Sequence, residues 1–358
     1  MGSDKAEKSL SKPGPVILMG SGETSPASGA VFEEAAKLYG NELRIAILET
    51  PAGFELNSKY VACRVGDFLN NRLQNYHPVI DIIPARKKGT GFSPDDESLL
   101  EPLYKADMIF MGPGSPTYAA RQLSGSLAYD IIQARQRNGC ALILSSAATI
   151  AFGCQTLPVY EIYKAGMDIH WQEGLNFFQH YGLSLVIIPH WNNAEGGAEL
   201  DTSHCFMGAD RFSELKSILG CQGAILGIDE HTSIWIDLDE GKAKIFGKGS
   251  IHLITKDDED NFESGTQINL KKFGKFQTLT DWRINLRQDV VKKLESSKWH
   301  DQRSSSEMPS EEIMEWLHQR DTARQSGDFT LADQIRQWIE GAGWRVKDTP
   351  SGSQIERL

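Results

Sequence analysis

The residue best placed to act as a nucleophile is Ser146. It follows the most apolar run of the chain, residues 140–144, and precedes two small residues, Ala147 and Ala148. A buried strand that ends in a serine and continues as a helix presents the hydroxyl at a sharp, exposed turn, as nucleophilic catalysis requires. The same context also suits a serine that caps a helix N-terminus. Both interpretations stay open on these residues alone.

A nucleophilic serine needs a general base, and His190 is the best candidate. It follows the apolar run 185–188 and one proline, so a strand would carry it to a sheet edge. The polar, glycine-rich stretch 192–201 comes next, and Glu195 or Asp201 within it could bind an amine. A plain exposed loop explains that stretch equally well. No metal is predicted, because the chain lacks a paired-histidine zinc pattern.

Two further charged residues have more than one interpretation. Arg211 could bind a substrate carboxylate through its fork of N–H donors, or lie on the surface at the start of a helix. Glu230 follows a predicted strand near the site. For Glu230 a structural hydrogen-bonding role is the better interpretation.

A mainly parallel sheet is expected to position these residues. Helical stretches alternate with apolar strands predicted at 16–19, 44–48, 79–83, 107–111 and 140–144. This alternation indicates an α/β fold with helices on both faces of the sheet. Ligands bind beyond the carboxyl ends of such strands, where the turns 20–22, 112–115 and 145–148 fall. Strands at 224–228, 233–236 and 244–246 are expected to complete the same sheet in antiparallel orientation.

Composition bounds the remaining choices. The chain has 358 residues and a net charge of −11, which argues against a broad nucleic-acid or acidic-membrane footprint. Its five cysteines form no CxxC pair, and its first residues lack an apolar signal core. We therefore expect a cytoplasmic protein with reduced thiols and no cofactor or membrane span.

Four segments carry a resemblance to a known family: MGPGS at 111–115, LSSAAT at 144–149, IPHWN at 188–192 and GIDEHT at 227–232. In order and spacing, residues 14–256 resemble the cyanophycinase and aspartyl dipeptidase (dipeptidase E) family of serine peptidases, which has a class I glutamine amidotransferase-like fold. The pattern departs at Leu144 and Ala148, where the family has glycines. Its Gly-Gly-Gly-Asn turn is Gly-Pro-Gly-Ser here.

The resemblance implies a role for each matching residue. Ser146 would be the nucleophile, His190 the general base and Glu161 the carboxylate that orients the histidine, with Glu173 and Asp168 as competitors. Gly114 and Ala147 would supply the N–H groups of an oxyanion hole, since Pro113 has none. The substrate-binding candidates are Ser115, Asn192, Glu195 and Arg211.

The end of the chain resembles a different protein. The segments RDTAR at 320–324, DF at 328–329, ADQIR at 332–336 and DTPSG at 348–352 carry this resemblance. Through them, residues 310–358 are similar to the small C-terminal domain of cysteinyl-tRNA synthetases, and we expect a helical hairpin. Arg320, Arg324, Arg336 and Arg345 could cluster on one face and contact tRNA. However, residues 304–358 hold six basic and ten acidic residues. An acidic module attracts phosphate weakly, so we favour an interaction or structural module over an RNA binder.

The predicted organisation is a polar tail (1–13), an amidotransferase-like hydrolase domain (14–275), a linker (276–308) and the C-terminal module (309–358). The leading functional hypothesis is a serine hydrolase that cleaves an amide or peptide bond of a small substrate. The alternatives are a non-catalytic ligand- or RNA-linked binding protein on the same fold and, more distantly, an esterase. A homodimer stays open.

Overall fold

The computed structural model describes residues 12–220, 223–296, 311–349 and 352–357. The chain divides into two compact units, Met1–Lys292 and Lys293–Leu358. Nearly all of the predicted polar tail lies outside the described residues. No helix among the described residues is both long and apolar enough to cross a membrane.

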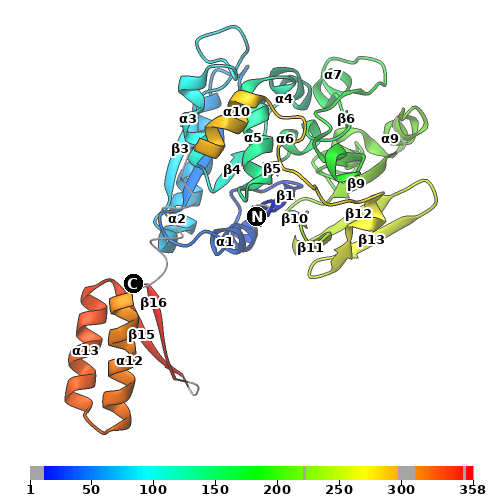
Figure 1. Ribbon diagram of the computed structural model, residues 1–358. Helices are drawn as coiled ribbons and strands as arrows, with labels where there is room; N and C mark the ends of the chain where they lie inside the picture. The colour runs from blue at the N-terminus through cyan, green and yellow to red at the C-terminus, as the bar shows by residue number, and fades with distance from the viewer. Residues whose placement is uncertain (1–11, 221–222, 297–310, 350–351, 358) are drawn as a thin grey trace, which may run out of the picture. The chain divides into compact units, whose positions relative to one another are not determined.

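The large unit is built on a mixed sheet of eight strands, in the order β14-β11-β10-β1-β5-β4-β2-β3 (Figure 1). Its strands are β1 (Val16–Met19), β2 (Arg44–Leu48), β3 (Val79–Ile83), β4 (Met108–Met111), β5 (Ala141–Ser145), β10 (Thr232–Asp237), β11 (Lys242–Gly247) and β14 (Gln267–Asn269). The five strands from β1 to β3 in that order are parallel, whereas β10, β11 and β14 pair antiparallel. The predicted α/β fold with a mainly parallel sheet is confirmed.

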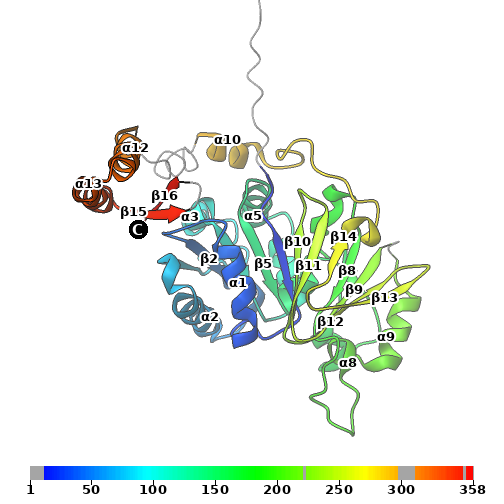
Figure 2. The same cartoon turned by 90° about the horizontal axis from the view of Figure 1, so that it is seen from below.

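Helices cover both faces of this sheet, which explains why its central strands are apolar on both sides. The larger helices are α1 (Gly29–Ala36), α2 (Ser58–Arg72), α3 (Glu97–Lys105), α4 (Pro116–Leu123), α5 (Leu127–Arg137) and α9 (Gly208–Ser217). Figure 2 shows α1 and α2 on one face, with α3 and α5 on the other. Leu144, the unusual residue before the serines, is fully buried on β5 between Leu18 and Met111. It packs within the sheet and leaves the turn open.

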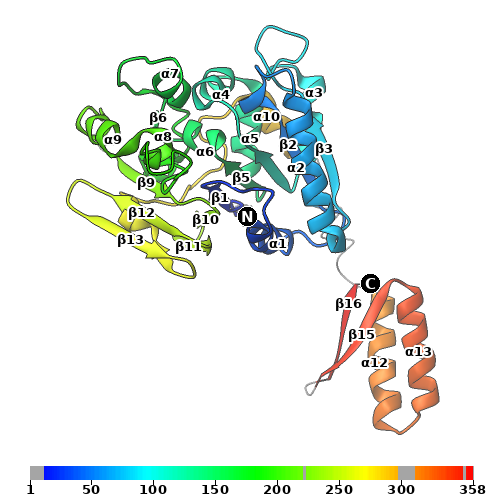
Figure 3. The same ribbon diagram turned by 180° about the vertical axis from the view of Figure 1, so that it is seen from behind.

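A second sheet lies beside the first and was not expected. It has the order β13-β12-β9-β8 and consists of β8 (Leu185–Ile188), β9 (Ala224–Ile228), β12 (Ser250–Ile254) and β13 (Glu259–Glu263). Figure 3 shows it alongside β10 and β11. The prediction that 224–228 joins the main sheet antiparallel is therefore wrong, because β9 pairs with β8 in parallel. The apolar sequence of β9 is compatible with either sheet, because a strand that is covered on two faces is apolar on both sides wherever it lies.

Short elements connect the two sheets around the carboxyl ends of β5 and β8. They are β6 (Gln155–Thr156), β7 (Gln172–Glu173), α6 (Ala147–Ala151), α7 (Val159–Tyr163) and α8 (Ser203–Phe206). The buried residues of α6 and α7 share a core with β8 and β9, including Ile150, Ile162 and Val186. This core fixes α6, which follows Ser146, relative to β8, which precedes His190.

Part of the predicted linker is folded against the large unit. The Arg137 guanidinium, 2% exposed, donates to the backbone oxygens of Trp282 and Ile284. The helix α10 (Gln288–Ser296) buries Val290 and Val291. Residues 297–308 of that predicted linker lie outside the described residues. The ordered part of the large unit therefore extends well beyond the predicted boundary at 275.

The second unit contains α12 (Glu311–Gln325), α13 (Phe329–Gly341), β15 (Trp344–Thr349) and β16 (Gly352–Arg357). The two helices form the expected hairpin, and Asp328 caps α13 by accepting from the Leu331 N–H at 3.0 Å. The antiparallel pair β15–β16 was not predicted. Trp344 and Val346 of this pair join Ile335 and Ile339 in one core, so the module has two helices and a β-hairpin.

Three of the described arginines of this unit, Arg320, Arg324 and Arg336, are engaged in ion pairs. Arg320 is 1% exposed, and its guanidinium donates to both Asp348 oxygens at 2.9 and 3.2 Å. Arg324 lies 3.3 Å from the same carboxylate, and Arg336 pairs with Glu340 at 2.9 Å. Internal pairing reduces the positive charge that these side chains can offer to a phosphate.

Candidate active site

Ser146 occupies a strained turn between β5 and α6. Its backbone φ of 52° lies in a region that non-glycine residues avoid, at a cost of roughly 1–3 kcal/mol. The turn is held by the Ser146 N–H, which donates to the Met19 oxygen at 3.3 Å, and by Thr149, whose hydroxyl donates to the same oxygen. The strain is thus fixed by the neighbouring strand β1. Ser146 lines a cavity at this turn.

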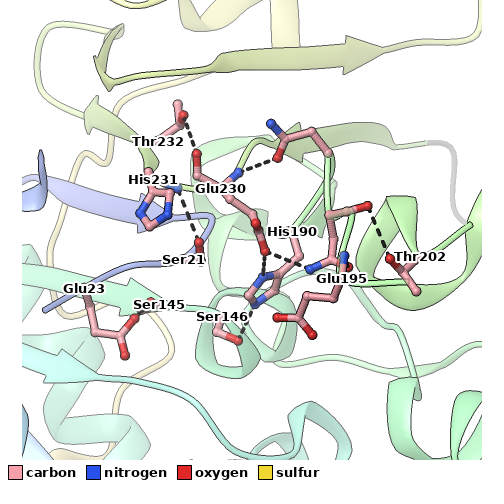
Figure 4. Close-up of polar contacts among 12 residues, drawn as sticks. Ser21, Glu23, Ser145, Ser146, His190, Glu195, Thr202, Glu230, His231 and Thr232 are labelled. Carbon is pink, nitrogen blue, oxygen red and sulfur yellow. Dashed lines mark hydrogen bonds and ion pairs between the residues drawn. The ribbon is translucent and has the colours of Figure 1, made fainter. Parts of the chain in front are cut away.

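His190 lies within hydrogen-bond distance of this hydroxyl, with Nε2 2.9 Å from the Ser146 Oγ (Figure 4). It follows β8 and also has a positive φ, 51°. Its backbone N–H donates to Gly20 after β1 at 3.3 Å. The next residue, Trp191, is buried against Gly227, where any side chain would collide with the indole. Trp191 therefore anchors the turn that presents His190.

The carboxylate that contacts His190 belongs to Glu230, in the turn between β9 and β10. Its Oε1 lies 2.9 Å from His190 Nδ1 and also accepts from Asn193 Nδ2 at 2.9 Å. Because a carboxylate only accepts, the proton of neutral His190 lies on Nδ1, and Nε2 is left to accept from Ser146. The hydrogen bond from His190, followed by that from Asn193, lowers the pKa of Glu230 to about 2.

Glu161 does not occupy the position that the family resemblance gives it. Its Oε1 accepts from the Thr117 hydroxyl at 2.5 Å, and its buried Oε2 has no hydrogen-bond partner among the described residues. The competitors Glu173 and Asp168 are exposed and make no described contact with His190. The expectation that one of these three residues orients His190 is corrected by the structure, which places Glu230 there.

Two backbone N–H groups border the cavity beside Ser146, those of Gly114 and Ala147. Ala147 is the first residue of α6, so its N–H has no acceptor within the helix. The Gly114 N–H has no hydrogen-bond partner among the described residues. Gly114 has φ 147°, and a Cβ there would lie 2.0 Å from the Pro51 oxygen, so only glycine fits this close approach. Neither N–H has an acceptor among the described residues, so both are available to a group bound in the cavity.

The cavity has a volume of about 350 Å³ and lies at the carboxyl ends of the strands. Apolar and aromatic side chains form much of its wall, together with two oppositely charged residues, Lys164 and Glu195. Its lining residues are Gly114, Pro116, Ser146, Ala147, Ile150, Val159, Tyr160, Tyr163, Lys164, His190, Glu195, Gly196, Thr202, Cys205 and Phe206. A concave, largely apolar site with a few polar groups is typical of small-molecule binding.

The remaining substrate-binding candidates lie elsewhere. The Ser115 hydroxyl is buried, caps α4 by accepting from the Tyr118 N–H at 3.2 Å, and lies 3.0 Å from the Thr117 hydroxyl. Asn192 accepts from the Glu230 N–H at 2.8 Å and so supports the Glu230 turn. Arg211 is exposed on α9 and does not line the cavity. Of the four candidates, only Glu195 lines the cavity.

Among the described residues, Cys205 is the one thiol that lines this cavity, and its environment is wrong for a nucleophile. Burial, with a smaller contribution from the charge of Glu230, raises the pKa of Cys205 to about 12. The thiolate that would attack is therefore scarce at neutral pH. Among the described residues, no three His, Cys, Asp or Glu side chains are grouped so as to hold a metal ion.

Comparisons with known proteins give a fold but no family. No protein-family model matches the chain, and no curated protein matches it. Its structure is similar to that of a peptidase from an acI-B1 actinobacterium, with a TM-score of 0.58 and 18% identity, over 73% of this chain and 98% of that one. The chain shares that fold. A putative peptidase E protein from Listeria monocytogenes EGD-e gives a TM-score of 0.45 and 15% identity, over 66% and 98% of the two chains.

Two residues at the site were missed by sequence reasoning. Glu230 was recognised as lying near a strand end but was given a structural role. Asn193 was treated as part of a polar loop, yet it is 3% exposed and bonded to Glu230. The turns that follow β8 and β9 lie side by side, because these strands are parallel neighbours. Pairing the run 224–228 with the run 185–188 would therefore have predicted that Glu230 lies near His190.

Proposed function

We propose that this protein is a serine peptidase that cleaves a small peptide or amide through an acyl-enzyme. The observation that carries the proposal is the continuous relay from Ser146 through His190 to Glu230, with both hydrogen bonds at 2.9 Å. Nucleophile, base and orienting carboxylate in this order are what activates a serine hydroxyl. The fold shared with a peptidase supports the same assignment.

In the proposed reaction, the Ser146 Oγ attacks the carbonyl carbon while His190 Nε2 takes the hydroxyl proton. The carbonyl oxygen becomes an oxyanion, which accepts from the N–H groups of Gly114 and Ala147. Glu230 stabilises the imidazolium and keeps Nδ1 protonated. His190 then gives its proton to the leaving amine nitrogen as the C–N bond breaks. Water, deprotonated by His190, attacks the ester and releases the acid and Ser146.

A fluorophosphonate probe tests the activated serine directly, because it requires no knowledge of the substrate. We expect the wild-type protein to be labelled and Ser146→Ala to remain unlabelled. Ser145→Ala is the matched control: Ser145 is also a serine at this turn, but its hydroxyl is buried and donates to Glu23 at 2.9 Å. It should keep its labelling.

Two outcomes would count against the proposal. Equal labelling of the wild type and Ser146→Ala would place the reactive group elsewhere. Absence of labelling in folded wild-type protein would favour the alternative, a non-catalytic binding protein on the same fold. Circular dichroism of each variant shows whether it is folded, so a loss of labelling can be assigned to the hydroxyl.

A further inference from the structure

Glu195 is an exposed residue that lines the cavity next to Ser146 and His190, and no cation pairs with it among the described residues. Figure 4 shows its carboxylate directed toward the side of the cavity on which Ser146 and His190 lie. No hydrogen bond or ion pair to this carboxylate is present among the described residues, although its backbone N–H is held. An exposed carboxylate at the edge of a partly apolar cavity can form a charge-assisted hydrogen bond with a cationic group bound in that cavity. An ammonium group of the substrate would supply it.

The position of Glu195 is fixed relative to the relay by one buried residue, Asn193. The Asn193 Oδ1 accepts from the Glu195 N–H at 3.2 Å, and its Nδ2 donates to Glu230 at 2.9 Å. Thr202 holds the other end of the loop by donating to the Asn193 oxygen and accepting from the Gly196 N–H at 3.1 Å. The backbone of the loop is therefore anchored at Glu195, beside the cavity.

Another part of the cavity wall is aromatic, and its backbone is strained. His204, Cys205 and Phe206 have φ values of 53°, 58° and 68°, three consecutive non-glycine residues in the left-handed region. Such strain persists where the surrounding structure requires it, often at functional sites. It brings the Phe206 ring to 6.1 Å from His190 and 5.3 Å from Tyr163, centroid to centroid. Ile150 and Val159 extend this wall.

Resting on the proposed peptidase function, we infer that the substrate is a short peptide with a free amino terminus and an apolar or aromatic first side chain. Its ammonium group pairs with Glu195, and its side chain packs against Phe206, Tyr163 and the neighbouring aliphatic residues. An acidic side chain in this place would have to leave water for an aromatic wall, at a considerable cost.

Lys164 is the competing feature, because a cation in the cavity could attract an acidic side chain. Both Lys164 and Glu195 are exposed, but the Lys164 Nζ already has a cation–π contact, 4.7 Å from the centroid of the Tyr163 ring, whereas the Glu195 carboxylate has no contact of this kind among the described residues. The position of Lys164 at the edge of the aromatic wall suits the terminal carboxylate of a short peptide. The first side chain is then left to the apolar surface.

The test compares four substrates on the full-length protein: phenylalanyl-alanine, leucyl-alanine, aspartyl-alanine and N-acetyl-phenylalanyl-alanine. We expect kcat/KM for the two apolar dipeptides to exceed that for aspartyl-alanine by at least about 10-fold. Acetylation, which removes the ammonium charge, should lower kcat/KM by about 10- to 100-fold. Cleavage is followed by release of free alanine.

A pair of variants separates recognition from general damage. Glu195→Gln should lower kcat/KM for the free dipeptides and leave the acetylated substrate nearly unchanged, so the effect of acetylation largely disappears. Glu199→Gln removes another exposed carboxylate of the same loop that does not line the cavity. It should behave as the wild type does, with the full effect of acetylation retained.

Fluorophosphonate labelling of the same preparations distinguishes the two levels of failure. If the wild type is labelled but cleaves aspartyl-alanine as well as the apolar dipeptides, or cleaves the acetylated substrate equally well, the inference is overturned and the peptidase stands. Labelled protein that cleaves none of the four also overturns it. If Ser146 is not labelled, the proposed function itself fails, and this inference fails with it.

Discussion

Two glutamates lie near the catalytic pair, and they have very different surroundings. Glu161 is on α7, where one carboxylate oxygen accepts from Thr117 and the other is buried without a partner among the described residues. Glu230 is in the turn between the two sheets, where His190 and Asn193 both donate to the same oxygen. Only the second arrangement can hold an imidazole in the orientation that activates a serine.

The difference shows that closeness along the chain is a poor guide to a relay that spans two sheets. Ser146 belongs to the first sheet, whereas His190 follows β8 of the second. The Glu230 turn joins β9 of the second sheet to β10 of the first, so it passes the junction where those two ends meet. A carboxylate in that turn reaches His190 for reasons of topology.

The largest expected effect separates these two glutamates. Glu230→Gln keeps the shape of the side chain but removes its charge, and its amide can impose the wrong tautomer on His190. We expect the rate of fluorophosphonate labelling to fall by about 10³- to 10⁴-fold, as for the equivalent change in a serine-protease triad. Glu161→Gln retains an acceptor for Thr117 and should stay within a few-fold of wild type.

Thermal melts of both variants serve as the control, because each should remain folded. The comparison would be reversed if Glu161→Gln lost as much reactivity as Glu230→Gln. The proposed role of Glu230 would also be contradicted if Glu230→Gln reacted at the wild-type rate, because Ser146 and His190 would then react without a carboxylate beside His190.

An intermediate effect is expected at Asn193, which donates to Glu230 without contacting His190 through its side chain. Asn193→Ala should slow labelling by about 10-fold through looser positioning of Glu230. Asn193→Asp keeps the acceptor for the Glu195 N–H but sets a second carboxylate against Glu230. Two such carboxylates resist ionising together.

The pH dependence distinguishes positioning from simple structural support. For Asn193→Asp we expect labelling to be slower than in Asn193→Ala at neutral pH. Relative to wild type measured at the same pH, it should recover as the pH falls and one carboxyl is protonated. A parallel pH profile for both variants would show that Asn193 only maintains the fold of the loop.

Much of the fold could be predicted because its signals are local. Continuous apolar runs such as β5 are typical of strands buried on two faces, and the turn after β5 directed attention to Ser146. The second sheet could not be predicted in the same way. The run that becomes β9 is equally apolar in either sheet, and only its long-range pairing with β8 decides between them.

The site could be predicted to about the same extent as the fold. Its prediction was wrong for the same reason, the sheet assignment of β9. Ser146, His190, Gly114 and Ala147 follow individual strands or begin a helix, so local pattern and resemblance place them together. Glu230 depends on the assignment of β9, and an incorrect sheet for that strand leaves the turn without a reason to face His190. In the C-terminal unit, likewise, the helices are local and were expected, whereas the ion pair of the buried Arg320 with the exposed Asp348 requires the β-hairpin.

The smallest expected effect concerns stability rather than catalysis and tests whether Glu230 is charged throughout the working pH range. Its pKa in the folded protein, about 2, lies below the ordinary value of 4.5. A carboxyl with a lowered pKa stabilises the folded state above its ordinary pKa, and this contribution is lost as the pH falls toward the folded value.

Glu230→Gln should therefore melt a few degrees below wild type between pH 5 and 8, by differential scanning calorimetry. The difference should shrink steadily as the pH falls from about 4.5 toward 2. A difference that stays constant across that range would mean that Glu230 gains nothing from His190 and Asn193, and the contrast with Glu161 would lose its electrostatic basis.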